Sequence, residues 1–586
     1  GEIESRACQY PGIRNAVAEV RREQLVLYYS AEAPLDDKKL RVWLADSLAD
    51  YMVPTAYVFL DEMPMTSNGK INRKALPDVE NQRTAEEYVA PRNETEKRLC
   101  DAFARVLNLS EDRVGIHDDF FDLGGDSIKS MRVVSLLGIE GLTTPDLYRG
   151  RTPERIAATV AERGGEITLE GEQHARRMTL PASSGQVNMV DYQFVHVRSL
   201  MYNMPMLYAL PGSTDAHRLI EAVTAAIRNH PALCTALEMD DNGVVLQRYR
   251  PEWLPEIRLE EAQPCGLEQT FSELIQPVTI FRQPLMRAKV IRCGEKLYLF
   301  MDMHHAVSDG TSIEVLLSDI VRAYNGEPLP EDYYYSYILA ETRMLRTDEY
   351  QNAKYYFEGI LGQCEWCNVP TPDYESWEAD AGEERMDMGL TTAQIHTAQV
   401  RHGASGNILC IAAALLALQE YCGRPDVLVN WIDHNRTNEH YENTVGMLFR
   451  ILPVAVRMEK CETVEKLLRE VSRQVAMGFA NSSCDFMSER ESALEDTIEI
   501  NYQVGVWDED PMTALGAEEV DLRPENQATG GRVGMYIEDW PGGTVGVSVE
   551  YQKKAYAQGS MARFLGMFRK YLRSIVTGSE KTDEKD

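Results

Sequence analysis

The stretch Leu297-Tyr-Leu-Phe-Met-Asp-Met-His304-His305-Ala-Val-Ser-Asp309-Gly310 decides the fold of the largest part of this chain. Its apolar residues predict a strand over 296–303, and side chains alternate along a strand, so the two adjacent histidines point to opposite faces. The Ser-Asp-Gly that follows predicts a turn, and an amphipathic helix is expected over 313–324. Only one of the two imidazoles can therefore face a given cleft.

The chemistry of His304 and His305 allows three interpretations. They could bind a metal ion, but the sequence has neither a His-x-x-x-His spacing nor a carboxylate at ligand spacing beside them, so we expect no metal. They could be buried core residues. Alternatively, one imidazole could act as a base or a hydrogen-bonding partner, because its unperturbed pKa of about 6.5 suits proton transfer at neutral pH.

Predicted helices and strands alternate around this motif. Apolar periodicity predicts helices over 216–228 and 407–421, and strands over 427–431 and 543–551. The simplest arrangement is two α/β lobes of similar size, at about 178–360 and 361–580.

Two smaller units are predicted ahead of the lobes. Residues 1–80 combine strand-like segments with a helix over 36–50 and predict an α+β unit, whereas 88–165 predict a bundle with helices over 94–107, 127–137 and 152–163. Segments rich in polar, Gly and Pro residues separate these units. At about 150 residues per domain, the length of 586 residues also predicts about four units.

The composition excludes several classes of protein. Sixty Lys+Arg against 92 Asp+Glu give a net charge of -32, which disfavours binding to nucleic acid or to anionic lipid. The longest apolar run, 408–418, is too short to span a membrane, and the first residues do not resemble a signal peptide. Eleven cysteines without a disulfide framework favour a reducing cytoplasm. The spacing of Cys364 and Cys367 suits half a zinc site or a redox pair, but no second such pair exists, so we interpret it as coincidence.

A serine after two glycines stands in Asp118-Asp-Phe-Phe-Asp-Leu-Gly-Gly-Asp-Ser127. Asp126 or Ser127 would be a natural N-cap for the next helix, which is a purely structural role. A hydroxyl at a helix N-terminus can also receive a phosphodiester, because the backbone N–H groups there favour anions.

The same run resembles the DxFFxLGGxS segment of acyl and peptidyl carrier proteins, and Tyr88-Val-Ala-Pro-Arg-Asn-Glu-Thr-Glu resembles the start of such a carrier. The resemblance implies a four-helix carrier bundle that bears 4'-phosphopantetheine on Ser127, attached by a phosphopantetheinyl transferase. Ser127→Ala should then abolish loading.

Residues 1–80 resemble the small C-terminal subdomain of adenylation domains. The resemblance rests on Gly1-Glu-Ile-Glu, Leu48-Ala-Asp-Tyr-Met-Val-Pro54 and Ser67-Asn-Gly-Lys70-Ile-Asn-Arg-Lys-Ala-Leu-Pro77. It implies that Lys70 is the lysine that reaches the substrate carboxylate and the ATP phosphates. The adenylation core is missing, so we expect a fragment that depends on that core to activate an amino acid.

Residues 178–580 resemble the condensation-domain superfamily of nonribosomal peptide synthetases, which is related to chloramphenicol acetyltransferase. The histidine stretch matches the family's HHxxxDG motif, and further matches are Pro181–Gln186, Asn229–Leu233, Phe281–Arg287 and Val445–Pro453. The resemblance implies two lobes of chloramphenicol-acetyltransferase-like fold with a channel between them. It also implies that His305 is the active-site histidine, His304 its buried neighbour and Asp309 a residue that holds the loop by an ion pair. The reaction would be attack of an acceptor amine on a carrier-bound thioester.

Two residues depart from the family pattern. The arginine that follows the leucine of the RHExLRT segment and usually partners the motif aspartate is Cys234, and the asparagine of GxFxNxxP is Arg450. Asp309 then needs another cation, for which Arg287 is the candidate. These departures favour one alternative to condensation, a catalytically inactive domain that docks carriers or recruits an enzyme. A second alternative is epimerisation of the carrier-bound aminoacyl group.

Epimerisation is supported by the GGDSI ending of the carrier motif, by Asn443-Thr-Val-Gly and by Ile500-Asn-Tyr-Gln-Val-Gly505. However, the family's EGHGR motif aligns with Ile432-Asp-His434-Asn-Arg436, which lacks the glutamate. We favour condensation, because epimerisation needs that second acid–base group. The acceptor is then expected in trans, as another chain's carrier protein or as a free amine.

Overall fold

The computed structural model divides into two compact units. The first comprises residues 1–137, 149–161 and 462–469, and the second comprises 138–148, 162–461 and 470–586. The structure describes residues 2–578 except 22–23, 37–38, 41–42, 45–53, 55, 65–70, 78–87, 108, 110–113, 122, 124, 126, 138–141, 143, 163–167, 263–272, 282, 363, 376–380, 437–438, 487–496, 505–509, 521–532 and 541.

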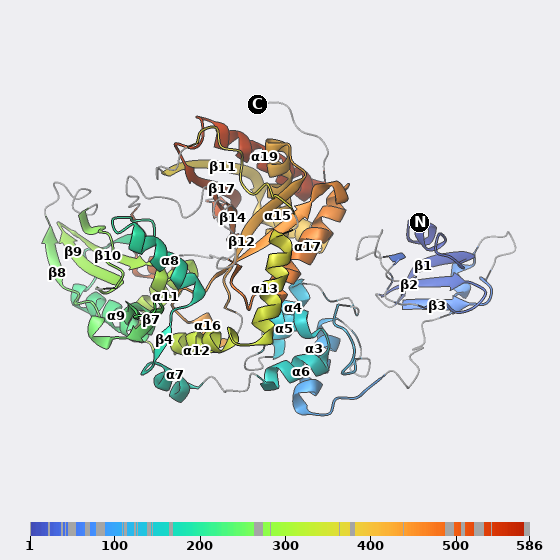
Figure 1. The fold of residues 1–586 in the computed structure, drawn as a ribbon, viewed down its shortest axis with the longest axis horizontal. Coiled ribbons are helices and arrows are strands. Elements are labelled where there is room, and N and C mark those ends of the chain that lie inside the picture. The colour runs from blue at the N-terminus through green and yellow to red at the C-terminus, as the bar shows by residue number, and fades with distance from the viewer. Residues whose placement is uncertain are drawn as a thin grey trace. The chain divides into compact units, whose positions relative to one another are not determined.

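The first unit begins with a three-stranded sheet and short helices (Figure 1). Its elements are α1 (Glu2–Ala7), β1 (Asn15–Arg21), β2 (Gln24–Ser30), β3 (Ala56–Leu60) and η2 (Arg73–Ala75). Strand β2 lies in the middle, antiparallel to β1 and parallel to β3. Alternating residues of β2 enter two different cores, with Leu27 and Tyr29 on one face and Val26 and Tyr28 on the other. The strand-like segments that the sequence predicts at 24–30 and 56–60 form β2 and β3, whereas most of the predicted helix over 36–50 lies outside the described residues.

Four helices follow along the chain: α3 (Glu94–Val106), α4 (Ser127–Leu137), α5 (Thr144–Gly150) and α6 (Pro153–Glu162). Helix α3 begins where the Asn93 side chain accepts a hydrogen bond from the Glu96 backbone, and it buries Leu99 and Phe103. The Phe103 ring packs on Phe120, with 4.7 Å between ring centroids. Gly125 suits the tight turn beneath Phe120, because a Cβ at this position would overlap the Phe120 ring.

Among its described residues, the second unit contains three sheets with helices around them; two of the sheets form the part that we call the first lobe, and the third forms the second lobe. The first lobe has a five-stranded sheet of order β15-β5-β10-β9-β8 and a three-stranded sheet of order β4-β7-β6. Its strands are β4 (Thr179–Pro181), β5 (Asn203–Leu210), β6 (Thr235–Met239), β7 (Val245–Tyr249), β8 (Leu259–Ala262), β9 (Met286–Cys293), β10 (Lys296–His304) and β15 (Glu518–Glu519). Its helical segments are α7 (Leu169–Ala175), α8 (Ser184–Val195), α9 (Ala216–Asn229), η4 (Pro231–Cys234), η5 (Pro251–Trp253), η6 (His305–Val307), α11 (Gly310–Asn325), α12 (Tyr334–Met344) and α13 (Asp348–Leu361).

The second lobe has a six-stranded sheet of order β11-β17-β16-β14-β12-β13. Its strands are β11 (Ala381–Thr391), β12 (Asp426–Asp433), β13 (Arg450–Arg457), β14 (Ile498–Tyr502), β16 (Val533–Trp540) and β17 (Thr544–Gln552). Its helical segments are α14 (Thr392–His402), α15 (Gly406–Cys422), α16 (Glu439–Glu442), η7 (Met458–Lys460), α17 (Val464–Ala480) and α19 (Ser560–Thr577). The segment η9 (Pro511–Leu515) belongs to the first lobe, because it packs against α11 and its Met512 enters the core of that lobe. Helices α15 and α19 lie side by side against this sheet (Figure 1).

The lobes do not divide the chain at one point. Strand β15 comes from residues beyond 361 but pairs with β5 in the sheet of the first lobe. The predicted boundary at 360/361 therefore assigns β15 to the second lobe, although this strand belongs to a sheet of the first lobe. The boundary misses it because strand pairing connects residues far apart in the chain. Among the described residues, no single helix is long and apolar enough to cross a membrane; α14 and α15 meet those criteria only as a pair, and they are bent by 90°.

Candidate active site

The paired histidines stand at the end of the middle strand of the first lobe's large sheet. Strand β10 pairs antiparallel with β5 on one side and with β9 on the other. All its residues from Leu297 to His304 are buried, which explains the long apolar run in the sequence. The predicted helix begins three residues earlier than expected, at Gly310, because the Asp309 side chain caps it.

His304 is fully buried and uncharged. Its Nδ1 accepts a hydrogen bond of 3.1 Å from the Ala306 backbone N–H, so the ring proton of the neutral imidazole lies on Nε2. Burial, together with the neighbouring His305, lowers the pKa of His304 to about 3. His304 therefore supports the turn and has no accessible proton-transfer role at neutral pH.

His305 leaves the strand and begins the short helical turn η6, where the residue is partly exposed. Its backbone N–H donates to the Tyr202 carbonyl at 2.8 Å, and its ring meets the Phe449 ring edge-on with 5.5 Å between centroids. Burial lowers the pKa of His305, and the negative charge of Asp309 opposes that shift. The imidazole is therefore neutral at pH 7 and able to accept a proton.

A glutamine from the first lobe supports the turn after His305. Gln186 donates from Nε2 to the Ala306 carbonyl at 2.7 Å and to the Tyr334 hydroxyl at 2.9 Å. It also forms a capping box with Ser183 at the start of α8. The predicted Pro181–Gln186 match thus lies directly against the histidine turn.

Asp309 is buried and accepts five hydrogen bonds. The Ser312 backbone and hydroxyl each donate at 2.8 Å, the Leu448 backbone donates at 3.1 Å, and the Arg436 guanidinium donates at 2.9 and 3.1 Å. Burial opposes ionisation, but the charge and hydrogen bonds of Arg436 and the bonds from Ser312 hold the pKa of Asp309 below its usual value. Asp309 is therefore an ionised brace beneath the turn.

The cation expected beside Asp309 was wrongly predicted. Arg287 pairs instead with Asp302, at 2.9 Å, because both residues lie at opposite positions on the neighbouring strands β9 and β10. The partner of Asp309 is Arg436, which follows β12 in the second lobe. The sequence signal for this partner is the match of Arg436 to the last residue of the EGHGR motif.

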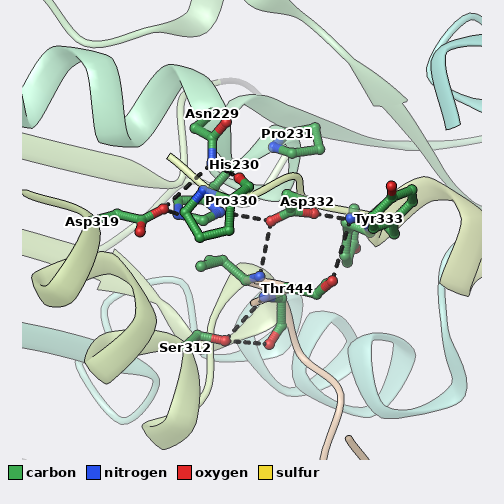
Figure 2. A network of polar contacts seen from close by, with 12 residues as sticks. Asn229, His230, Pro231, Ser312, Asp319, Pro330, Asp332, Tyr333 and Thr444 are labelled. Carbon is green, nitrogen blue, oxygen red and sulfur yellow. Dashed lines mark hydrogen bonds and ion pairs between the residues drawn. The ribbon is translucent and has the colours of Figure 1, made fainter. Parts of the chain in front are cut away.

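A second network ties the lobes together and is centred on His230 (Figure 2). The buried imidazole lies 2.7 Å from Asp332 and 3.2 Å from Asp319, and these two carboxylates outweigh the effect of burial and raise its pKa to about 9. Asp332 also accepts from the Val445 backbone at 3.0 Å. Beside this contact, Ser312 donates to the Gly446 carbonyl at 2.9 Å. The segment 444–446 of the second lobe is therefore fastened to the first lobe next to the histidine turn.

The two departures from the family pattern are buried in different surroundings. Cys234 lies in the apolar core of the first lobe, where burial raises the pKa of its thiol to about 12. Arg450 is 6% exposed and pairs with Glu341 at 3.3 Å, and Glu341 also accepts from the Ser184 hydroxyl at 3.1 Å. Arg450 thus has a local counter-ion from α12.

The remaining predicted site residues are less fully described. Ser127 is the first residue of the eleven-residue helix α4, a position that suits an attached phosphodiester, but its side chain lies outside the described residues, as does Lys70. Among the described residues, no group of three or more His, Cys, Asp or Glu side chains could hold a metal ion.

Comparisons with known protein families match three parts of the chain. Residues 177–585 match the condensation domain, 97–160 match the phosphopantetheine attachment site, and 2–70 match the AMP-binding enzyme C-terminal domain.

Several curated proteins are similar to this chain. Tyrocidine synthase 2 of Brevibacillus parabrevis is 29% identical over 83% of this chain and 14% of its own length. Surfactin synthase subunit 1 of Bacillus subtilis (strain 168) is 30% identical over 78% of this chain and 13% of its own length. The chain spans between 8% and 23% of the length of such relatives.

Solved structures share the fold of the two lobes. The first condensation domain of the calcium-dependent antibiotic synthetase matches with a TM-score of 0.56 and 16% identity, over 70% of this chain and 99% of that one. The epimerization domain from the third module of tyrocidine synthetase B gives 0.55 and 18%, over 66% and 94%. The X-domain from teicoplanin biosynthesis gives 0.56 and 18%, over 68% and 94%. Because catalytic and other domains share this fold, the fold alone does not decide the activity.

Proposed function

Since this chain belongs to the condensation-domain family of nonribosomal peptide synthetases, we propose that residues 177–585 join a carrier-bound acyl thioester to an acceptor amine. The C–N bond of the new amide forms, the C–S bond of the thioester breaks, and the proton lost by the nitrogen reaches the departing sulfur. The observation that carries this proposal is the neutral imidazole of the partly exposed residue His305, on a turn held by hydrogen bonds from Gln186 and His304.

His305 suits this reaction because its environment keeps it uncharged. An amine with a pKa near 8 must lose a proton to attack, and a neutral imidazole accepts that proton or orients the free amine. The turn that carries His305 is held by hydrogen bonds. Gln186 and His304 bond to the backbone of Ala306, and Asp309 accepts from the backbone of the helix that follows the turn. Most of the acceleration would come from holding two tethered reactants together, which replaces a bimolecular encounter by a near-unimolecular step.

The carrier domain would supply the donor substrate. Phosphopantetheine, once attached to Ser127, provides a thiol on a flexible arm that holds the acyl group as a thioester. Ser127 is the proposed attachment point because it begins α4 directly after the Gly-rich turn. A phosphopantetheinyl transferase, an adenylation core and an acceptor carrier or free amine are the partners that this arrangement requires.

The test is to load the carrier with an aminoacyl-pantetheine, offer an acceptor amine and follow the products by intact-mass spectrometry. We expect a new amide that requires both Ser127 and His305. His305→Ala should abolish the amide but leave loading of the carrier intact. The matched control is His217→Ala, an exposed histidine on α9, which should retain the wild-type rate. Equal amide formation by His305→Ala would overturn the proposal.

The same sample tests the second candidate function, epimerisation. The observation in its favour is Asp433, the residue after the aligned Ile432, whose pKa burial raises to about 6, which suits a proton-transfer group. Exchange of the α-hydrogen with deuterated water, without amide formation, would indicate epimerisation. Neither product from a fully loaded carrier would indicate a domain that docks carriers or recruits an enzyme.

A further inference from the structure

Two cysteines meet in the second lobe although they are far apart in the sequence. Cys367 lies next to the start of β12, where its backbone bonds to Asp426 and Leu428 at 2.9 Å each. Cys422 is the last residue of α15 and precedes the left-handed Gly423 that ends the helix. Two regular elements therefore position the two thiols. The neighbour of Cys367 is Cys422, and not Cys364, with which it forms the C-x-x-C spacing.

The two sulfur atoms share hydrogen-bonding partners. Both approach the Val369 carbonyl oxygen, at 3.9 Å from Cys367 and 3.6 Å from Cys422. The two free thiols also form a hydrogen bond with each other. In addition, the Thr371 hydroxyl donates a hydrogen bond to the Cys422 sulfur at 3.5 Å. Arg424 places a positive charge nearby and is itself held by the Glu365 carbonyl at 2.8 Å.

These contacts shift the pKa values of the two thiols in opposite directions. The hydrogen bond from Cys367 lowers the pKa of Cys422 below that of an ordinary thiol, against the effect of burial, and the Thr371 hydroxyl assists. The same contact, with burial, raises the pKa of Cys367. Cys422 is also partly exposed, whereas Cys367 is buried. Cys422 is thus the thiol that loses its proton more readily and that reagents in water can reach, next to a buried thiol that keeps its proton.

We propose that Cys367 and Cys422 form a redox-sensitive pair that hydrogen peroxide or an organic peroxide converts into an intramolecular disulfide. The Cys422 thiolate attacks one peroxide oxygen, the O–O bond breaks, and Cys422 becomes a sulfenic acid while hydroxide, or an alkoxide, leaves. The Cys367 sulfur then attacks the Cys422 sulfur, the S–O bond breaks, and water leaves with the thiol proton. Two thiols are oxidised by two electrons, and the peroxide is reduced.

The other buried cysteines offer a contrast within the same chain. Burial raises the pKa of Cys100 and of Cys234 to about 12, so both remain thiols at neutral pH. The pair is connected to the candidate active site through strand β12. This strand begins beside Cys367 and ends at Asp433, and the loop that follows it carries Arg436, the partner of Asp309. A disulfide would lock α15 to the segment that precedes this strand.

The experiment oxidises the full chain with hydrogen peroxide at pH 7 and maps its tryptic peptides without reduction. Trypsin leaves Cys364 and Cys367 on one peptide and Cys422 on another. A disulfide between Cys367 and Cys422 therefore cross-links two peptides, whereas one between Cys364 and Cys367 closes a loop within a single peptide. We expect a cross-link between the Cys367 and Cys422 peptides with a mass loss of about 2 Da. Cys364→Ser should keep the cross-link and Cys422→Ser should lose it.

A second measurement does not depend on any variant. Alkylation of the reduced wild-type chain by iodoacetamide should modify Cys422 faster than the partly exposed Cys461, with a rate whose midpoint lies below the pKa of an ordinary thiol. A loop within the 364/367 peptide, a Cys422 that stops at sulfinic acid without a cross-link, or a midpoint near that of an ordinary thiol would each overturn the proposal.

Discussion

Replacing Arg436 by methionine should destabilise the second unit, because it leaves the Asp309 carboxylate buried without a counter-ion. Asp309 would keep its bonds from Ser312 and Leu448, but the two charge-assisted bonds from the guanidinium would be lost. Breaking a buried pair by removing one partner costs about 3–5 kcal/mol. The matched residues 177–585 make up about 400 residues with an unfolding entropy of ~0.8 kcal/mol per kelvin, so Tm should fall by about 4–6 °C.

Differential scanning calorimetry measures this shift, and the pH dependence identifies its cause. In the wild type the pKa of Asp309 is depressed, so its contribution to stability is present above the unfolded pKa of about 3.9 and is lost as pH falls through the folded pKa. Without Arg436, burial favours the protonated acid, so the deficit of Arg436→Met should be full at pH 7 and shrink as pH falls toward 4.

Arg385→Met is the matched control for this prediction. Arg385 pairs with Glu383 at 2.7 Å, but its side chain is 53% exposed, and such surface pairs contribute about 0–1 kcal/mol. Asp309→Asn in the Arg436→Met background should recover part of the lost stability, because the buried charge is then gone. Two outcomes would show that the contact between Arg436 and Asp309 is not an ion pair: a loss of stability in Arg436→Met no greater than in Arg385→Met, or a loss of stability that does not change with pH.

Three further predictions follow from the same contacts. In an NMR titration, the His305 imidazole should titrate below pH 6.5, because burial lowers its pKa, and a midpoint above 6.5 would contradict a neutral base. Arg450→Asn, which restores the family residue, should lower the free energy of unfolding by about 3–5 kcal/mol, because the Glu341 carboxylate loses its counter-ion. Glu341→Gln in the same background should recover part of that loss. If Arg450→Asn lost no stability, the pair would not be ionised. The raised pKa of His230 means that its ionic contribution is complete below pH 6.5 and disappears as pH rises through about 9, so the Tm difference between wild type and His230→Gln should shrink over that range; a constant difference would argue against a charged His230.

The sequence predicted much of the fold because most of its elements are set by local patterns. The buried run that predicts a strand over 296–303 forms β10, and the periodic leucines and alanines over 216–228 form α9, which buries Leu219, Val223 and Ile227. Errors of one to three residues at the ends have local causes, such as the Asp309 cap on α11. The assignment of β15 to the first lobe was missed, because a two-residue strand has no period of its own.

Of the candidate site, the sequence by itself determined the residues that one contiguous motif carries: His304 and His305 on a strand end, and Asp309 at the start of the next helix. Alternation along the strand predicted the two imidazoles on opposite faces; in the structure His304 is buried at the end of β10, whereas the partly exposed His305 leaves the strand and begins η6. Only the tertiary structure decided the partners: Arg436 rather than Arg287 for Asp309, Asp319 and Asp332 around His230, and Cys422 rather than Cys364 for Cys367. The physical reason is that periodicity reports the local direction of a side chain, whereas ion pairs and thiol contacts depend on which distant elements the packing brings within a few ångströms, and charge or spacing alone does not encode that choice.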